Sequence, residues 1–188
     1  AGNIVNASPI GDITMILLAL NAEVNLDTRS IPLKEFYLGY KKLNINKGEY
    51  IKSITFPVST KSNLFNFEKV SKRTHLDIAS VNSAIQIRME GETIADCSLS
   101  AGGIGPIPMF LSKTCEFLKE KTITTDTILK ANEILQEEIS PIGDVRGSID
   151  YKRLLLRQLF FAHFIKLFPD KVKFSDLIKD ITVSNNKM

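Results

Sequence analysis

The first residues of the chain have the types and spacing of a segment that binds a small molecule. Gly2 and Asn3 open this segment, and Asp12 ends it, directly before an apolar periodic stretch. Small residues leave backbone N–H groups open to a cofactor, and the Asp12 carboxylate can accept from the free amides of a helix. We therefore expect a loop that leads into a helix over residues 12–20, capped by Asp12. In isolation, such a composition is more often an ordinary turn before a helix.

A second candidate residue, Lys69, lies in a stretch of alternating hydrophobicity. Phe65, Phe67 and Lys69 share one face of a predicted strand, whereas Leu64 and Val70 share the other. This pattern sets the lysine ammonium beside two aromatic rings. The ordinary alternative is a strand lysine whose ammonium group stays in solvent.

Few side chains in this sequence are soft metal ligands. The chain has two cysteines, two histidines and no CxxC motif, so neither a zinc site nor an iron–sulfur cluster can be built from it alone. We expect Cys97 and Cys115 to be small apolar core residues and His163 to be a packed, hydrogen-bonded imidazole. No catalytic residue and no metal ligand is assigned.

Composition indicates an ordinary globular protein. The 188 residues are 44% hydrophobic and 24% charged, with a net charge of +3. The lysines and arginines are interleaved with acids, which does not favour a nucleic-acid partner, and no uncharged run approaches the ~18 residues of a membrane span. The small number of cysteines favours a reduced, cytoplasmic setting. Because the chain lacks an initial methionine, we expect an excised segment of a longer protein.

The order of strand and helix signals in the sequence predicts an α+β fold, whose elements must position these residues. Strand signals are followed by helix signals, and a glycine-rich stretch over 101–106 separates them. The last helix is apolar around most of its circumference, so we expect it to be buried in a bundle or at a subunit contact. The predicted strands cover 22–26, 50–57, 64–70, 81–89 and 93–100, and the predicted helices cover 112–121, 125–139 and 148–168.

The pentapeptide Ser-Pro-Ile-Gly-Asp occurs twice, at residues 8–12 and 140–144. Its flanks differ in pattern, so we interpret the duplication as a coincidence of turn chemistry rather than an internal repeat. Arg146, which follows the second copy, is expected to tie a loop to the helices through hydrogen bonds to carbonyl groups.

Four segments in a fixed order resemble the flavin-binding part of the xanthine dehydrogenase family. The order extends over residues 1–168, nearly the whole chain. The segments are Gly2-Asn3 through Asp12, Gly39-Tyr40-Lys41-Lys42, Lys69 through Arg73 with Asp77-Ile78-Ala79, and Ser140 through Ser148 with Tyr151-Lys152-Arg153. Relatives often carry Gly-Tyr-Arg-Lys-Thr in the second segment, so this chain lacks a bidentate guanidinium and a hydroxyl there.

The resemblance implies the flavin module of a molybdenum hydroxylase. In such enzymes iron–sulfur clusters and molybdopterin, expected elsewhere in the enzyme, deliver electrons to FAD, which passes them to an acceptor such as NAD. The implied partners are the iron–sulfur and molybdopterin domains or subunits, in an oligomer. The implied fold is part of an FAD-binding domain (1–60), then an antiparallel meander packed on a three-helix bundle (61–175), then a tail (176–188).

The resemblance also implies which residues contact FAD. The Gly-Asn pair of the family matches Gly2 and Asn3, and its terminal aspartate matches Asp12. Lys69 matches a lysine near the isoalloxazine ring, where a cation favours the anionic reduced flavin. The implied cofactor-binding set is Gly2, Asn3, Val5, Asn6, Asp12, Tyr50, Ile51 and Lys69. The alternative hypothesis is a flavin-free module that docks subunits through its long apolar helix.

Overall fold

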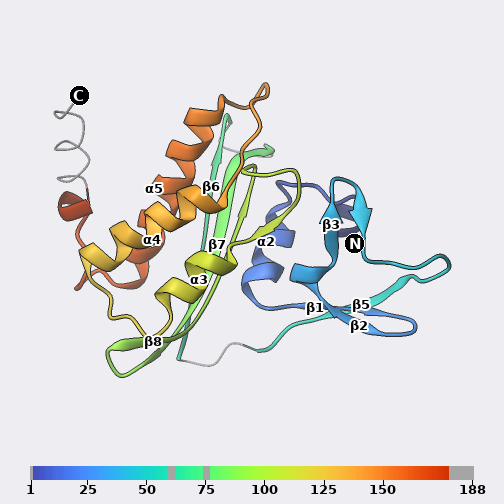
Figure 1. Ribbon diagram of the computed structural model, residues 1–188, viewed down its shortest axis with the longest axis horizontal. Helices are drawn as coiled ribbons and strands as arrows, with labels where there is room; N and C mark the ends of the chain where they lie inside the picture. Colours follow the sequence, from blue (N-terminus) through green and yellow to red (C-terminus); the bar gives the residue numbers. More distant parts are fainter. Residues whose placement is uncertain (1, 59–61, 74–76, 178–188) are drawn as a thin grey trace.

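Three layers make up the part of the chain that the computed structural model describes, residues 2–58, 62–73 and 77–177 (Figure 1). The middle layer is an antiparallel sheet, with helices on one side and the first part of the chain on the other. Its strands follow the order β6-β7-β8-β9. They are β6 (Asn63–Ser71), β7 (Ala79–Glu90), β8 (Thr93–Gly102) and β9 (Met109–Phe110).

Alternation along the strands separates the two faces of this sheet. Phe65 and Phe67 of β6 pack toward the first part of the chain, whereas Leu64 and Val70 pack toward the helices. This confirms the division of faces predicted from the sequence. Strand β9 was not predicted, because its two residues are too short a run to show a period.

Helices α3 (Ser112–Leu118), α4 (Thr125–Glu138) and α5 (Ile149–Leu167) cover one face of the sheet (Figure 1). They confirm the three predicted helices, each with a slightly earlier end. Helix α5 begins where predicted, because Ser148 Oγ accepts from the Tyr151 backbone N–H at 3.2 Å.

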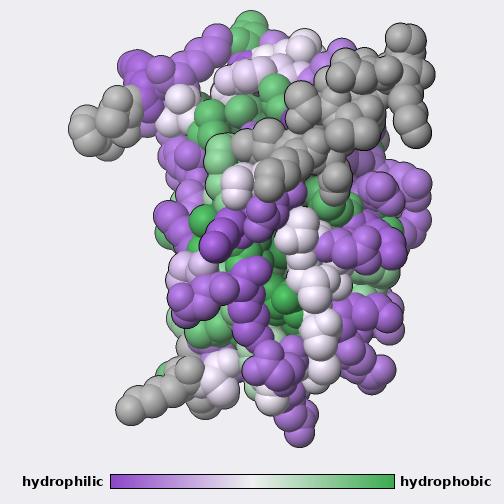
Figure 2. Space-filling model, turned by 90° about the vertical axis from the view of Figure 1, so that its left-hand side faces the viewer, coloured by the Kyte–Doolittle hydropathy of each residue, from purple (hydrophilic) through white to green (hydrophobic). Residues whose placement is uncertain are grey.

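The apolar residues of α5 fill the core between this helix and the sheet. Phe160, Phe161 and Phe164 are at most 2% exposed, and the rings of Phe160 and Phe164 meet edge to face at 5.1 Å. The face of the molecule on the helix side shows many polar side chains, with apolar ones between them (Figure 2).

The first part of the chain packs on the opposite face through helix α2, which contacts β7 and β8. Around α2 lie a three-stranded sheet in the order β2-β1-β5 and a two-stranded sheet, β3-β4. The elements are α1 (Gly2–Val5), α2 (Asp12–Ala19), β1 (Glu23–Leu26), β2 (Ser30–Pro32), the 3₁₀ helix η1 (Leu33–Glu35), β3 (Tyr37–Gly39), β4 (Lys42–Leu43) and β5 (Ile51–Thr55).

Two expectations for the start of the chain are wrong. The predicted loop begins with a short helix, α1, in which the Asn6 N–H donates to the Gly2 carbonyl at 2.9 Å. Asp12 is not the cap of α2, because Gly11 holds that position and no side chain caps the helix. The Asp12 carboxylate is instead taken by Lys69 and Asn82.

The far end of the described chain still belongs to the core. Leu177 is fully buried in the helix-side cluster, two residues beyond the predicted end of the second subdomain. Residues 59–61, at the predicted subdomain boundary, and 178–188 of the predicted tail lie outside the described residues. No helix within the described ranges has the length and apolar character needed to cross a membrane.

Candidate cofactor-binding site

Asp12, Lys69 and Asn82 form a polar cluster between α2 and the sheet. Lys69 Nζ lies 2.6 Å from Asp12 Oδ2, and Asn82 Nδ2 donates to Asp12 Oδ1 at 2.5 Å. Lys69 and Asn82 are paired across β6 and β7, so their side chains leave the same face. The side chains of Lys69 and Asp12 are 28% and 35% exposed, which leaves this ion pair within reach of a ligand.

Asn82 is a site residue that the sequence interpretation missed. It is fully buried, and its Nδ2 also donates to the Ile10 carbonyl at 3.2 Å. Among the described residues its Oδ1 has no hydrogen-bond partner, which leaves one buried acceptor free. The available signal was strand alternation, which sets this amide on the face opposite to Val81 and Ser83.

Two glycines let the start of the chain lie against the end of β8. A Cβ on Gly102 would lie 2.3 Å from Asn82 Oδ1 and 2.7 Å from the Pro9 carbonyl oxygen. Gly103 has a φ of +82°, and its N–H donates to the Pro9 carbonyl at 2.9 Å. The glycine stretch therefore ends strand β8, although β9 after it returns to the same sheet, and it brings the Asp12 segment close to Asn82.

Both copies of the duplicated pentapeptide line one cavity of about 160 Å³ beside this cluster. Pro9 and Ile10 come from the first copy, and Ile142 and Asp144 come from the second. The wall is completed by Tyr40, Ser80, Gly103, Gly105, Pro106, Arg146 and Lys152. Although the sequence shows no internal repeat, the fold brings the two copies to the same place.

Charged groups gather on one side of this cavity. Lys152 Nζ, almost fully buried, lies 3.0 Å from Asp144 Oδ1 and donates to the Ile142 carbonyl at 2.7 Å. Burial raises the pKa of Asp144, but hydrogen bonds from Lys152 and the Arg146 N–H outweigh it and hold this pKa below its usual value. Arg146 Nη1 lies 3.8 Å from Asp144 Oδ2, so its guanidinium faces a carboxylate rather than the carbonyls that we expected.

Helix α1 presents the remaining residues of the predicted Gly-Asn segment. Gly2, Asn3, Val5 and Asn6 are exposed, while Ile4 is buried and anchors the turn. No atom outside the adjacent residues lies within 4 Å of a Cβ built on Gly2, whereas the Asn3 side chain lies beside Gly11. Asn3 therefore lies beside the N-terminus of α2, and the side chains of Asn3 and Asn6 are exposed.

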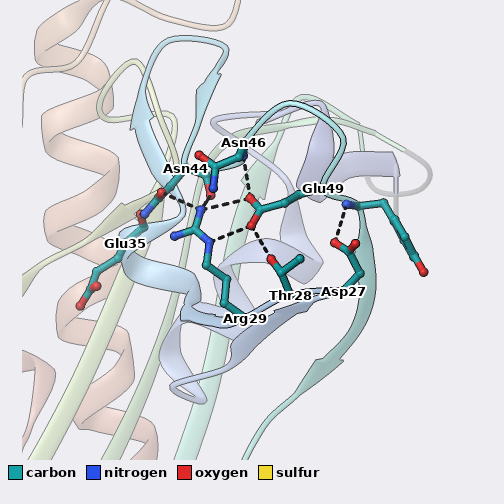
Figure 3. A network of polar contacts seen from close by, with 8 residues as sticks. Asp27, Thr28, Arg29, Glu35, Asn44, Asn46 and Glu49 are labelled. Carbon is teal, nitrogen blue, oxygen red and sulfur yellow. Dashed lines mark hydrogen bonds and ion pairs between the residues drawn. The ribbon is translucent and has the colours of Figure 1, made fainter.

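Tyr50 and Ile51 lie on a different sheet, at the start of β5. A network of polar contacts orders the loop before them (Figure 3). Arg29 Nε lies 3.0 Å from Glu49 Oε1. Hydrogen bonds from Arg29, Thr28 and the Asn46 N–H lower the pKa of Glu49 to about 2.

The position of Tyr50 follows from the same loop. Its backbone N–H donates to Asp27 Oδ1 at 3.3 Å, and its side chain is 60% exposed. Ile51 is half-buried and packs at the edge of the first-part core. The structure thus joins Asp12 to Lys69 directly and orders Tyr50 and Ile51 separately.

The residues that the structure gathers fit the polar atoms of FAD. Exposed amides suit phosphate and ring carbonyl oxygens, and a carboxylate suits ribityl or ribose hydroxyls. Lys69 supplies a partly exposed cation, and the unpartnered Asn82 Oδ1 shows that the cluster still has acceptor capacity. Within the described ranges, no group of three or more metal-ligating side chains is found.

Family models match two segments of the chain. Residues 1–59 match the FAD binding domain in molybdopterin dehydrogenase, and residues 67–167 match the CO dehydrogenase flavoprotein C-terminal domain.

Curated relatives agree with the family models. The chain is 30% identical over 174 residues to xanthine dehydrogenase 1 of Arabidopsis thaliana, which covers 87% of this chain and 13% of the relative. It is 32% identical over 194 residues to a nicotinate hydroxylase of Emericella nidulans, covering 96% of this chain and 14% of that protein. The glyceraldehyde dehydrogenase medium chain of Sulfolobus acidocaldarius is 29% identical over 167 residues, covering 87% of this chain and 59% of its own length.

The fold matches a solved structure of carbon monoxide dehydrogenase from Hydrogenophaga pseudoflava. The TM-score is 0.79 at 23% identity, over 85% of this chain and 56% of the matched chain. The α+β fold predicted from the sequence is therefore confirmed, and so is the family resemblance. The chain belongs to the CO dehydrogenase flavoprotein family and carries the FAD-binding domain of a molybdenum hydroxylase.

Proposed function

We propose that the chain forms the flavin step of a molybdenum hydroxylase, in which electrons pass from iron–sulfur clusters through FAD to an acceptor such as NAD. The observation that carries this proposal is the Lys69–Asp12–Asn82 cluster. FAD supplies the redox chemistry when bound, while this chain supplies position and charge.

Each member of the cluster has its own part in this proposal. Lys69 places a positive charge where negative charge develops on reduction, and Asp12 accepts hydrogen bonds from the cofactor's hydroxyl groups. Asn82 holds the Asp12 carboxylate in place through its 2.5 Å hydrogen bond. Gly2, Asn3 and Val5 of α1, with Asn6 directly after it, form an adjoining wall, and Tyr50 and Ile51 flank the flavin at the start of β5.

The cavity between the two pentapeptides supports an anionic acceptor. Ile10 links it to the cluster, because its carbonyl accepts from Asn82 and its side chain lines the cavity. The Arg146 side chain is 33% exposed at this cavity, whereas the Lys152 ammonium is already enclosed. Arg146 is therefore the cation that would meet a phosphate of NAD.

This function implies further parts of a larger assembly. The chain spans 13% of the matched plant xanthine dehydrogenase, so we propose that iron–sulfur and molybdopterin domains accompany it in a cytoplasmic oligomer. We further propose that residues 1–60, 61–175 and 176–188 are the second half of an FAD-binding domain, its C-terminal subdomain and a tail. The alternative, a flavin-free docking module, rested on α5, but that helix packs its aromatic side chains into the core.

The test is to add FAD to the full protein that carries this chain, remove free FAD, denature the protein and measure the fluorescence of the flavin that is released, because iron–sulfur clusters also absorb visible light. Released FAD in proportion to the protein supports the proposal, whereas no released FAD supports the docking module.

The acceptor is tested by reducing the flavin without oxygen and adding NAD. We expect NAD to reoxidise the flavin, and Arg146→Gln to raise the KM for NAD about tenfold by removing a charge-assisted contact worth roughly 1.5 kcal/mol. Reoxidation by dioxygen alone would show that NAD is not the acceptor.

A further inference from the structure

Two cysteines face a cavity on the side of the molecule away from the Asp12 segment. The cavity has a volume of about 390 Å³ and lies where the end of α2 and the helix η1 meet β8 and α3. Asn21, from the first part, donates to Ser98 Oγ at 2.7 Å across this junction. Cys97 and Cys115 both line the cavity, and both are free thiols.

The two thiols line the same cavity although they come from different elements. Cys97 lies on β8 and Cys115 on α3, and they are 6% and 7% exposed. Interaction with Cys115, together with burial, raises the pKa of the Cys97 thiol. The Cys115 sulfur accepts a hydrogen bond from the Leu99 backbone N–H at 3.1 Å.

The two sulfur atoms differ, because a backbone N–H is aimed at the Cys115 sulfur, whereas the pKa of the Cys97 thiol is raised. The Leu99 N–H orients an electron pair of the Cys115 sulfur. Two lysines, Lys34 and Lys119, line the same cavity. The cavity is also wide enough to admit a small neutral oxidant to the sulfur atoms.

We propose that Cys97 and Cys115 form a redox modification site that hydrogen peroxide converts into a disulfide. The Cys115 sulfur attacks one peroxide oxygen, so that the O–O bond breaks, Cys115 becomes a sulfenic acid and one water forms. The Cys97 sulfur then displaces the hydroxyl group, which leaves as a second water with the Cys97 proton. Two thiols are oxidised by two electrons, and one peroxide is reduced to two waters.

The product would join β8 to α3 next to the contact between Asn21 and Ser98. Because the linkage closes a loop within the second part of the chain, we expect it to stabilise the folded state. The proposal does not depend on FAD binding, since neither cysteine belongs to the Asp12 cluster.

The experiment treats the folded full protein with a small excess of hydrogen peroxide, removes the peroxide, alkylates the remaining thiols under denaturing conditions and maps the peptides. We expect a peptide pair linked through Cys97 and Cys115, reversible by a dithiol, and a rise in Tm of about 5 °C. Alkylation of both cysteines after peroxide treatment, to the same extent as before, would overturn the proposal.

Single substitutions test the two roles. In Cys97→Ser, Cys115 should accumulate a sulfenic acid that dimedone traps, because the resolving thiol is gone. In Cys115→Ser, Cys97 should stay a free thiol under the same conditions. Dimedone labelling of Cys97 in that variant would contradict the assignment. If either variant does not fold, the peptide map of the unsubstituted protein decides whether the disulfide forms.

Discussion

The two faces of strands β6 and β7 carry two polar clusters at neighbouring positions, and the clusters differ in kind. On one face, Lys69 and Asn82 meet Asp12 in a partly exposed ion pair. On the other face, Asn66 of β6 and Ser83 of β7 enclose His163.

The His163 cluster is sealed. His163 is fully buried, its Nδ1 lies 2.8 Å from Asn66 Nδ2, and its Nε2 lies 3.0 Å from Ser83 Oγ. The amide nitrogen can only donate, so Nδ1 accepts and Nε2 carries the proton of a neutral ring. Ser83 Oγ in turn donates to the Ser100 carbonyl at 2.9 Å, so each hydrogen-bonding atom of the ring has a partner.

Asn82 and Ser83 are adjacent on β7, yet Asn82 belongs to the proposed binding cluster and Ser83 to the cluster that stabilises the fold. A strand alternates its side chains, so adjacent residues serve opposite layers. On the face that is covered by α5, the His163 ring completes its hydrogen bonds internally. The face that meets α2 combines a partly exposed ion pair with an amide oxygen that has no partner among the described residues, and a ligand can use this combination.

The largest expected effect comes from removing the sealed cluster. His163→Leu should lower the free energy of opening β6 and β7 by about 2–4 kcal/mol, because the buried Ser83 hydroxyl and the half-buried Asn66 amide each lose one of two hydrogen-bond partners. Native-state hydrogen exchange of the β7 amides measures this loss. FAD affinity should change little, since the other face is untouched. A large loss of FAD affinity with unchanged exchange would reverse the roles of the two faces.

The pH dependence of stability should come from the same face, through His163. Burial is the main cause that lowers the pKa of His163 to about 3, although Glu68 opposes it and Lys166 adds to it. In the unfolded chain the imidazole has its ordinary pKa of 6.5, so unfolding takes up protons as the pH falls below that value. Stability should therefore decrease from pH 6.5 toward pH 3, by at most about 1.4 kcal/mol per pH unit.

A pH series of hydrogen exchange measures this slope between pH 6.5 and 5, above the range in which the carboxylates titrate. The slope should vanish in His163→Leu. An unchanged slope in that variant would mean that another group is responsible.

Gly102→Ala should have a smaller effect on stability and a clear effect on the site. The added Cβ would lie 2.3 Å from Asn82 Oδ1, so the Asp12 segment must shift, at a cost of about 1–3 kcal/mol. We expect less retained FAD, measured as flavin fluorescence released on denaturation. Gly91→Ala is a useful control for a glycine substitution, because nothing lies within 4 Å of its added Cβ, although its φ of +58° adds local strain. Equal FAD retention in both variants would contradict a role for the Gly102 contact.

Local pattern accounts for what the sequence predicted correctly. The alternation from Leu64 to Val70 predicted β6 and its two faces, and Ser148 predicted the start of α5. His163 was predicted to be a packed, hydrogen-bonded imidazole, which the structure confirms.

What the sequence could not predict depends on contacts between distant segments. Asn82 reaches Asp12 only because β7 lies beneath α2, and the two pentapeptides meet only after the chain has folded. The Asp12 cap was wrong for the same reason, because a lysine 57 residues away takes the carboxylate.

The assignment of FAD to the Asp12 face is tested most directly by substituting two lysines that form ion pairs on opposite faces of the sheet. Lys69 and Lys166 each form an ion pair of 2.6 Å, Lys69 with Asp12 and Lys166 with Glu68. We predict that Lys69→Met in the full protein weakens FAD binding about 10- to 100-fold, the value of one charge-assisted hydrogen bond, and that Lys166→Met leaves it unchanged. Equal FAD dissociation constants for the two variants would contradict the assignment of the cofactor to the Asp12 face.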